Sequence, residues 1–149
     1  YNFKECMSSL ILTFEYNSKK YDLCNVHLSL ISGHLQRIDE LEEIKKNANN
    51  NFILCGDFNT FSHFTFNWLI GWFFKFKFGD YLVNERKKFR KLYHTKDLYN
   101  VFSHKITHPY TLTQLDHILV PYVFEVLEKK RIFKGLKYSD HIPLYVKFK

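Results

Sequence analysis

The sequence predicts an α/β fold in which helices cover a mixed β-sheet. Segments rich in β-branched and aromatic residues alternate with segments of helical periodicity along much of the chain. Phe52 to Cys55 is apolar on both faces, as expected of a strand in the middle of a covered sheet. The 149 residues suit one domain with a sizeable core, and neither a linker nor an internal repeat divides them.

The first third of the chain is predicted to form a β-hairpin and a helix. Ser9 to Tyr16 and Tyr21 to Leu28 have the composition of strands, and the polar segment Asn17 to Lys20 between them is typical of a turn. Gly33 to Asn47 has helical periodicity. Its apolar face comprises Leu35, Ile38, Leu41 and Ile44. The face expected in solvent comprises Arg37, Glu40, Glu43 and Lys46.

Three further strands are predicted in the last third of the chain. They are Leu115 to Val120, a segment within Val123 to Phe133, and Pro143 to Phe148, which alternates with period two. The middle of the chain has less periodicity. Within it, Tyr81 to Tyr93 is predicted to be a basic helix, whereas Phe64 to Phe74 is compatible with a helix or an irregular buried segment.

The formal charge of +7 favours a polyanionic partner, either nucleic acid or an anionic membrane surface. A lysine-rich solvated surface explains the same charge without any partner. The three cysteines are odd in number and lack metal-binding spacing. Cys24 and Cys55 lie in apolar runs, which suits free thiols in a reducing compartment, so we expect an intracellular, cytoplasmic protein.

Four short segments place polar residues at the ends of predicted strands, where a rigid sheet can present them to a ligand. They are Asn25-Val26-His27-Leu28, Gly56-Asp57-Phe58-Asn59-Thr60, Leu115-Asp116-His117-Ile118 and Ser139-Asp140-His141-Ile142-Pro143. Their carboxylates suit Mg²⁺, Mn²⁺ or Ca²⁺, and a carboxylate beside an imidazole suits proton transfer. Each segment alone has an ordinary structural explanation, and it is their order that is informative.

In that order, the four segments resemble the motifs of the endonuclease/exonuclease/phosphatase superfamily, which includes deoxyribonuclease I. The resemblance spans residues 25 to 143. It implies a four-layer α/β/β/α sandwich and a metal-dependent phosphoester hydrolase that uses Mg²⁺ or Mn²⁺. The chain would be one partial domain, residues 1–149, that lacks the first strands of the family's fold.

The resemblance also implies a role for each residue of the motifs. His27 matches the family histidine that contacts the scissile phosphate and takes part in proton transfer. Asp57 matches the aspartate that orients or activates the attacking water or helps to bind metal, and Asn59 matches the amide that holds the phosphate or that water.

The remaining roles fall near the C-terminus. Asp140 matches a metal-side carboxylate, so the expected metal ligands are Asp140 and Asp57. Asp116 matches the aspartate that orients His141, which itself matches the general base or phosphate donor. No family role corresponds to His117, which is expected to be exposed at the end of its strand, and the sequence gives no place to His104 or His108.

The chain departs from the family pattern at its N-terminus. The family domain begins with two further strands that carry an asparagine and a metal-binding glutamate, and neither Glu5 nor Glu15 has a matching context. We therefore expect the chain to need a missing N-terminal segment. The leading hypothesis is an endonuclease-type phosphodiesterase with a nucleic-acid substrate. The alternatives are a sphingomyelinase-like phospholipid hydrolase that contacts a membrane through Trp68 and Trp72, and a non-catalytic fragment.

Overall fold

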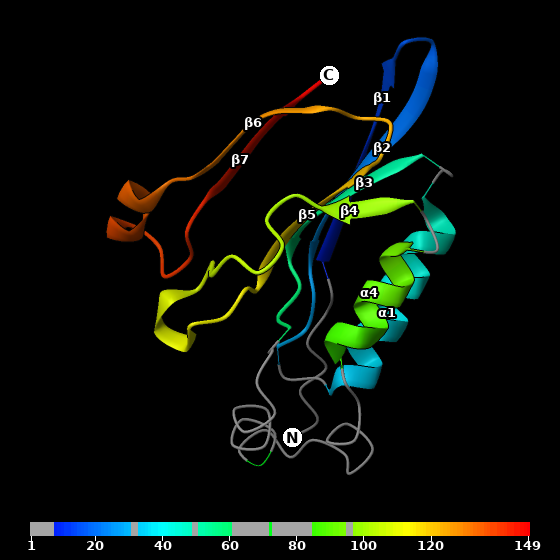
Figure 1. The fold of residues 1–149 in the computed structure, drawn as a ribbon. Helices are drawn as coiled ribbons and strands as arrows, with labels where there is room; N and C mark the ends of the chain where they lie inside the picture. Colours follow the sequence, from blue (N-terminus) through cyan, green and yellow to red (C-terminus); the bar gives the residue numbers. More distant parts are fainter. Residues whose placement is uncertain (1–7, 31–32, 49–50, 61–71, 73–84, 95–96) are drawn as a thin grey trace.

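The computed structural model describes residues 8–30, 33–48, 51–60, 72, 85–94 and 97–149 of the chain. Two α-helices pack on one face of a five-stranded sheet, and a two-stranded sheet packs on the opposite face (Figure 1). This arrangement confirms the predicted mixed α/β fold with two packed sheets. The described residues form three of the four expected layers, and they include no α-helix over the second sheet.

The five-stranded sheet has the order β1-β2-β3-β5-β4. Its strands are β1 (Ser8–Tyr16), β2 (Lys19–His27), β3 (Phe52–Asp57), β5 (Asp116–Pro121) and β4 (Leu98–Asn100). Only the β2–β3 pairing is parallel, and the other pairings are antiparallel. The predicted central strand is β3, which lies between β2 and β5 as its apolar faces require.

The second sheet consists of β6 (Val126–Arg131) and β7 (Leu144–Phe148), which pair antiparallel. Between these strands lies a 3₁₀ turn, Phe133–Lys137. The sequence predicted both strands but not β4, which has only three residues and therefore no readable period.

The β1–β2 hairpin closes through a two-residue turn. Asn17 and Ser18 both have positive φ, at 50° and 58°, as a primed hairpin turn requires. Lys19 and Lys20 therefore belong to β2, so the turn is two residues shorter than the predicted segment. The tight turn sets the pairing of β1 with β2 along their whole length.

Helix α1 (His34–Asn47) forms where predicted, but the residues that it buries differ from the prediction. Arg37 is fully buried and Glu40 is 9 % exposed, whereas Leu35 is 40 % exposed. Arg37 Nη1 donates to the Ser29 carbonyl at 3.1 Å, and the Ser29 N–H donates to Glu40 Oε2 at 3.2 Å. The expectation that both charged residues face solvent is therefore wrong, because they satisfy the buried backbone that follows β2.

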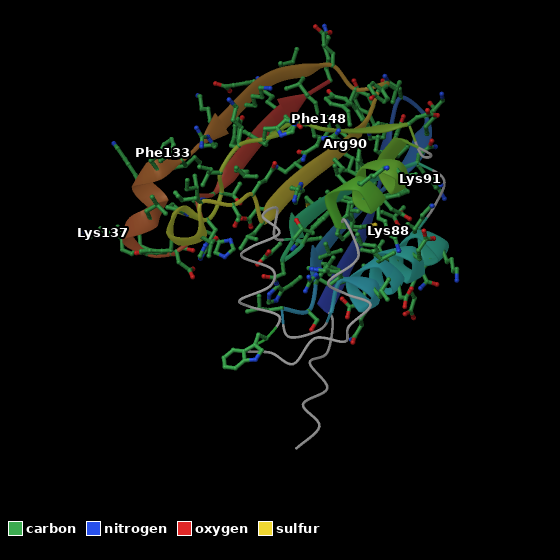
Figure 2. The ribbon with its side chains drawn as sticks, turned by 60° about the horizontal axis from the view of Figure 1, so that its bottom comes forward. Lys88, Arg90, Lys91, Phe133, Lys137 and Phe148 are labelled. Atoms are coloured by element: carbon green, nitrogen blue, oxygen red, sulfur yellow. The ribbon has the colours of Figure 1, made fainter. Side chains whose placement is uncertain are left out.

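Helix α4 (Glu85–His94) overlaps the predicted basic helix and lies beside α1 (Figure 1). The side chains of Lys88, Arg90 and Lys91 are exposed along it, and Lys137 projects from the connection between β6 and β7 (Figure 2). Basic side chains are thus exposed on helix α4 and in the connection between the two strands of the second sheet.

Two apolar clusters hold the layers together. Alternate residues of β2 and β3 face the helices, among them Cys24 and Leu54, while Ile53 and Tyr21 face the second sheet. Among the described cysteines, Cys24 and Cys55 are both free, as predicted, and burial raises the pKa of the Cys24 thiol to about 11, with smaller contributions from Asp22 and Cys55.

Several predictions concern segments outside the described residues, including Cys6, Trp68 and all of Phe64 to Phe74 except Trp72. Within the described part of the chain, no helix has the length and apolar character needed to cross a membrane.

Gly56 lies at a position of β3 where the backbone of β2 leaves no room for a side chain. Its φ is +125°, and a Cβ atom there would lie 2.0 Å from the backbone oxygen of Val26, which is its partner in the parallel ladder. The contact is with backbone, so rotation of a side chain cannot relieve it. The pairing of the two strands therefore requires a glycine as the first residue of the Gly-Asp-Phe-Asn motif.

We predict that Gly56→Ala lowers the free energy of unfolding by about 3 kcal/mol or more, because strained φ and steric overlap act together. Thermal unfolding followed by circular dichroism measures the change. The control is Gly33→Ser, since Gly33 precedes α1 with φ −69° and serine is a favourable residue there. Equal melting temperatures for Gly56→Ala and the unmodified protein would contradict the close approach.

Candidate functional site

Three of the predicted site residues form a row across the five-stranded sheet. His27, the last residue of β2, pairs with Asp57, the last residue of β3. Asp57 pairs in turn with Asp116, the first residue of β5. Directly paired residues project to the same face of a sheet. The row therefore places one imidazole and two carboxylates together at one edge of the molecule.

His141 completes this group from the loop before β7. Its Nδ1 lies 2.8 Å from Asp116 Oδ2, and its Nε2 lies 3.9 Å from Asp57 Oδ2. His27 Nε2 lies at the same distance, 3.9 Å, from the same oxygen of Asp57. The Asp57 carboxylate thus stands between two imidazoles that are 114 residues apart in the sequence (141 − 27). A cavity of about 270 Å³ opens beside Asp116 and His141.

The surroundings of Asp57 disfavour the ionised form of its carboxyl group. Burial raises the pKa of Asp57 above its ordinary value of 3.8, and the negative charge of Asp116 raises it further. The N–H of Asn59, which donates to Asp57 Oδ1 at 2.8 Å, and the charges of both imidazoles act in the opposite direction. The site therefore holds an excess of carboxylate charge that a cation would relieve.

His141 favours its protonated form. Burial by itself would lower the pKa of this imidazole, but the hydrogen bond to Asp116 and the charge of that carboxylate outweigh burial. The charges of Asp57 and Asp140 act in the same direction as Asp116, so the pKa of His141 lies above its ordinary value of 6.5. The side chain can therefore donate a proton near neutral pH.

Asn59 is buried behind the row rather than exposed in the cavity. It is 4 % exposed, and its Nδ2 donates to the carbonyl of Leu28 at 2.7 Å. The Leu28 N–H donates in turn to the carbonyl of Asp57 at 2.9 Å. In this structure Asn59 ties the segment after β3 to the segment after β2, with the local φ of 49° that asparagine tolerates.

Asp140 lies close to His108 and His141. Its side chain is 64 % exposed and its Oδ2 lies 3.5 Å from His108 Nε2. Among the residues that the structure describes, two sets of side chains have ligand atoms close enough for a metal: Asp57 with Asp116 and His141, and His108 with Asp140 and His141. The two predicted metal ligands thus fall in different sets, which share His141.

Thr107, a residue that no sequence motif singles out, holds these segments in place. Its buried Oγ1 accepts hydrogen bonds from the N–H groups of Leu115 and Asp116, both at 2.9 Å. Its carbonyl accepts a hydrogen bond from the N–H of Ile142 at 2.7 Å. Thr107 therefore joins the start of β5 to the loop that carries His141, and it brings its neighbour His108 into the site.

His117 is buried, which corrects the expectation that it is exposed at a strand end. It is 9 % exposed, its Nδ1 lies 2.8 Å from Asn100 Nδ2, and its Nε2 lies 3.1 Å from Thr60 Oγ1. The Asn100 amide must donate, because its oxygen accepts from the N–H of Phe102. His117 thus carries its proton on Nε2 and serves packing on the helix side of the sheet.

No protein-family model matches the chain, and no curated protein sequence matches it. Solved structures do share its fold. An endonuclease/exonuclease/phosphatase from Beutenbergia cavernae DSM 12333 superposes with a TM-score of 0.68 at 13 % identity, over 96 % of this chain and 39 % of that protein. The endonuclease domain of TRAS1, a telomere-specific non-LTR retrotransposon, superposes with a TM-score of 0.59 at 8 % identity, over 97 % and 67 %.

TDP2 of D. rerio in complex with a single-strand DNA product superposes with a TM-score of 0.57 at 15 % identity, over 99 % of this chain and 64 % of that one. The chain thus spans between 39 and 67 % of the length of these three structures. It has the deoxyribonuclease I-like fold of the endonuclease/exonuclease/phosphatase proteins, which confirms the fold that the four motifs implied.

We predict that Asp116→Asn lowers the pKa of His141, because the mutation removes both the charge and the strongest acceptor that favour the protonated ring. Imidazole C–H resonances followed by NMR against pH, with EDTA present, report this value. The pH dependence of stability should change too. A raised folded-state pKa stabilises the protein below the ordinary value of 6.5, and this contribution is lost as the pH rises through the folded-state pKa.

The control for this titration is Asp39→Asn, which removes one carboxylate from the exposed face of α1. It should leave the His141 titration where it is in the unmodified protein. An unchanged His141 pKa in Asp116→Asn would show that the pair does not interact in solution.

Proposed function

We propose that this chain carries the catalytic residues of a metal-dependent phosphoester hydrolase that works by activating water, most simply an endonuclease-type phosphodiesterase. The observation that carries the proposal is the Asp57 carboxylate between the imidazoles of His27 and His141. The shared fold adds weight, since one of the solved structures that have it is an endonuclease/exonuclease/phosphatase.

The residues at the site fit a hard divalent cation, Mg²⁺ or Mn²⁺. Asp57 and Asp140 offer carboxylate oxygens, each in a group of candidate ligands that includes His141, and the pKa of Asp57 is raised by burial and by the neighbouring charge of Asp116. A bound cation would neutralise phosphate charge and polarise the phosphorus–oxygen bonds.

The proposed roles of the side chains follow from their protonation. His141, held by Asp116 and favoured as the imidazolium, donates a hydrogen bond to a phosphate oxygen and stabilises the charge that develops there. Asp57 orients the attacking water, and Asn59 keeps Asp57 in place. His27, with a side chain that is 62 % exposed, contacts the phosphate from the solvent side of the cleft.

Nucleic acid is the substrate that the surface charge favours. Exposed basic side chains lie on α4 and beside the 3₁₀ turn Phe133–Lys137, and the formal charge of the chain is +7. The TRAS1 domain is an endonuclease, and the TDP2 structure contains a single-strand DNA product. Both observations concern other proteins, and they make DNA the first substrate to test.

A phospholipid is the second candidate substrate. Trp72 is 75 % exposed, as a side chain that enters a membrane interface would be. Its predicted companion Trp68 lies outside the described residues. We further propose an intracellular location, in which the free thiols of Cys24 and Cys55 remain reduced.

We predict that the full-length protein containing this chain hydrolyses a single-stranded oligonucleotide when Mg²⁺ is present, and that His141→Ala lowers kcat by at least about 10²-fold. The reason is that the variant loses the proposed donor to the phosphate. The matched control is His104→Asn, which changes an exposed histidine of positive φ on a turn outside the site and should keep the rate.

A fluorogenic oligonucleotide and phospholipid vesicles, assayed side by side, separate the two substrates. Faster turnover of the oligonucleotide supports the nuclease, and turnover of vesicles alone supports the phospholipid hydrolase. Equal rates for His141→Ala and the unmodified protein on both substrates would refute the catalytic proposal.

A further inference from the structure

A second group of metal-ligating side chains adjoins the proposed catalytic residues. It consists of His108, Asp140 and His141, each of which offers one ligand atom within 4.8 Å of the other two. We propose that this group binds Zn²⁺ and that the bound ion withholds His141 from the substrate phosphate. The proposed zinc binding rests on the geometry alone, whereas the proposed inhibition of hydrolysis also rests on the proposed function.

The separation of the ligand atoms suits zinc. His108 Nε2 and Asp140 Oδ2 are 3.5 Å apart. Two ligands of a tetrahedral ion with bonds of 2.0–2.2 Å are separated by about 3.3–3.6 Å. All three ligand atoms lie within 4.8 Å of one another, so rotation of the side chains would have to bring any wider pair to the separation that a bound ion requires.

Both imidazoles are oriented as zinc ligands usually are. The Nδ1 atom of His141 is held by Asp116 Oδ2 at 2.8 Å, and that of His108 by the hydroxyl of Thr111 at 2.7 Å. A hydrogen bond to one ring nitrogen fixes the tautomer and directs the other nitrogen to a metal. Each histidine therefore has Nε2 available for the ion.

The backbone that carries His108 is fixed before any metal binds. Thr107 accepts hydrogen bonds from β5 through its side chain and from the N–H of Ile142 through its carbonyl. Its own N–H donates to the carbonyl of Thr113 at 3.0 Å, which closes the loop around Thr111. The rings of His108 and His141 accordingly pack edge to face, with centroids 4.9 Å apart.

The chemistry of the group favours zinc over magnesium. Two imidazoles and one carboxylate form a borderline-soft ligand set, which binds Zn²⁺ well and Mg²⁺ poorly. The His108 side chain is 13 % exposed and that of His141 is 25 % exposed, while Asp140 is open to solvent at 64 %. Solvent can therefore supply the fourth ligand, as in zinc sites with three protein ligands.

Zinc bound in this group would compete with catalysis. His141 is the proposed donor to the phosphate, and its Nδ1 is already engaged with Asp116. Coordination of Nε2 leaves the ring no nitrogen for the substrate. Asp140 would be withdrawn from the hard-cation site by the same ion, so hydrolysis should stop without any change of fold.

The test is calorimetric titration of Zn²⁺ into the full-length protein in excess Mg²⁺. We expect one Zn²⁺ per chain in the unmodified protein, and a Kd at least about tenfold higher in His108→Gln. Asp140→Asn should weaken zinc binding in the same way. Because the Asp140 side chain is exposed, this variant should fold normally even if His108→Gln does not. The control His104→Asn should bind Zn²⁺ as the unmodified protein does.

Hydrolysis gives the second readout. With each variant normalised to its own zinc-free rate, the Zn²⁺ concentration that halves the rate should rise in His108→Gln by the same factor as the Kd. An unchanged Kd in both His108→Gln and Asp140→Asn would overturn the zinc site. Zinc that binds through His108 but leaves hydrolysis unaffected would overturn the inhibitory role. If the protein hydrolyses no phosphoester, the proposed function fails, while the calorimetric result still decides the site.

Discussion

The register of three adjacent strands is the constraint on which the site depends. Pairing of β2 with β3 and of β3 with β5 sets His27, Asp57 and Asp116 side by side. A slip of one residue in either ladder would turn a strand's side chains to the opposite face and bury the site residue against the helices. Gly56 protects the β2–β3 register, because only a residue without Cβ allows β3 to pass Val26 so closely.

His141 lies outside this register and depends on electrostatic attraction and on Thr107. Asp116 attracts the imidazole, while Thr107 secures the backbone on both sides of the contact. The pKa values of both neighbouring groups are raised, but for different reasons: burial disfavours the charge of Asp57, whereas the hydrogen bond and charge of Asp116 favour the protonated imidazole of His141. Under the proposed function, both side chains would be in position before a phosphate arrives.

Much of this arrangement could be predicted from the sequence, because polar residues at the ends of apolar strands meet at one edge of a sheet. The features that the sequence did not predict were missed for physical reasons. β4 is too short to show a period, and His108 and Thr107 lie in a loop where spacing carries no spatial information. Helical periodicity predicts that Arg37 faces solvent because periodicity reports hydrophobicity alone, whereas a hydrogen bond to the buried carbonyl of Ser29 holds the side chain inside.

His27 and His141 are proposed to face one cleft that binds a cation and a phosphate. Paramagnetic broadening by substoichiometric Mn²⁺ measures this directly through the imidazole resonances of the full-length protein. We expect both histidines to broaden together, while the amides of Asn17 and Ser18, in the turn at the opposite end of β2, stay sharp. Broadening of one histidine without the other, or of neither, would contradict the proposal.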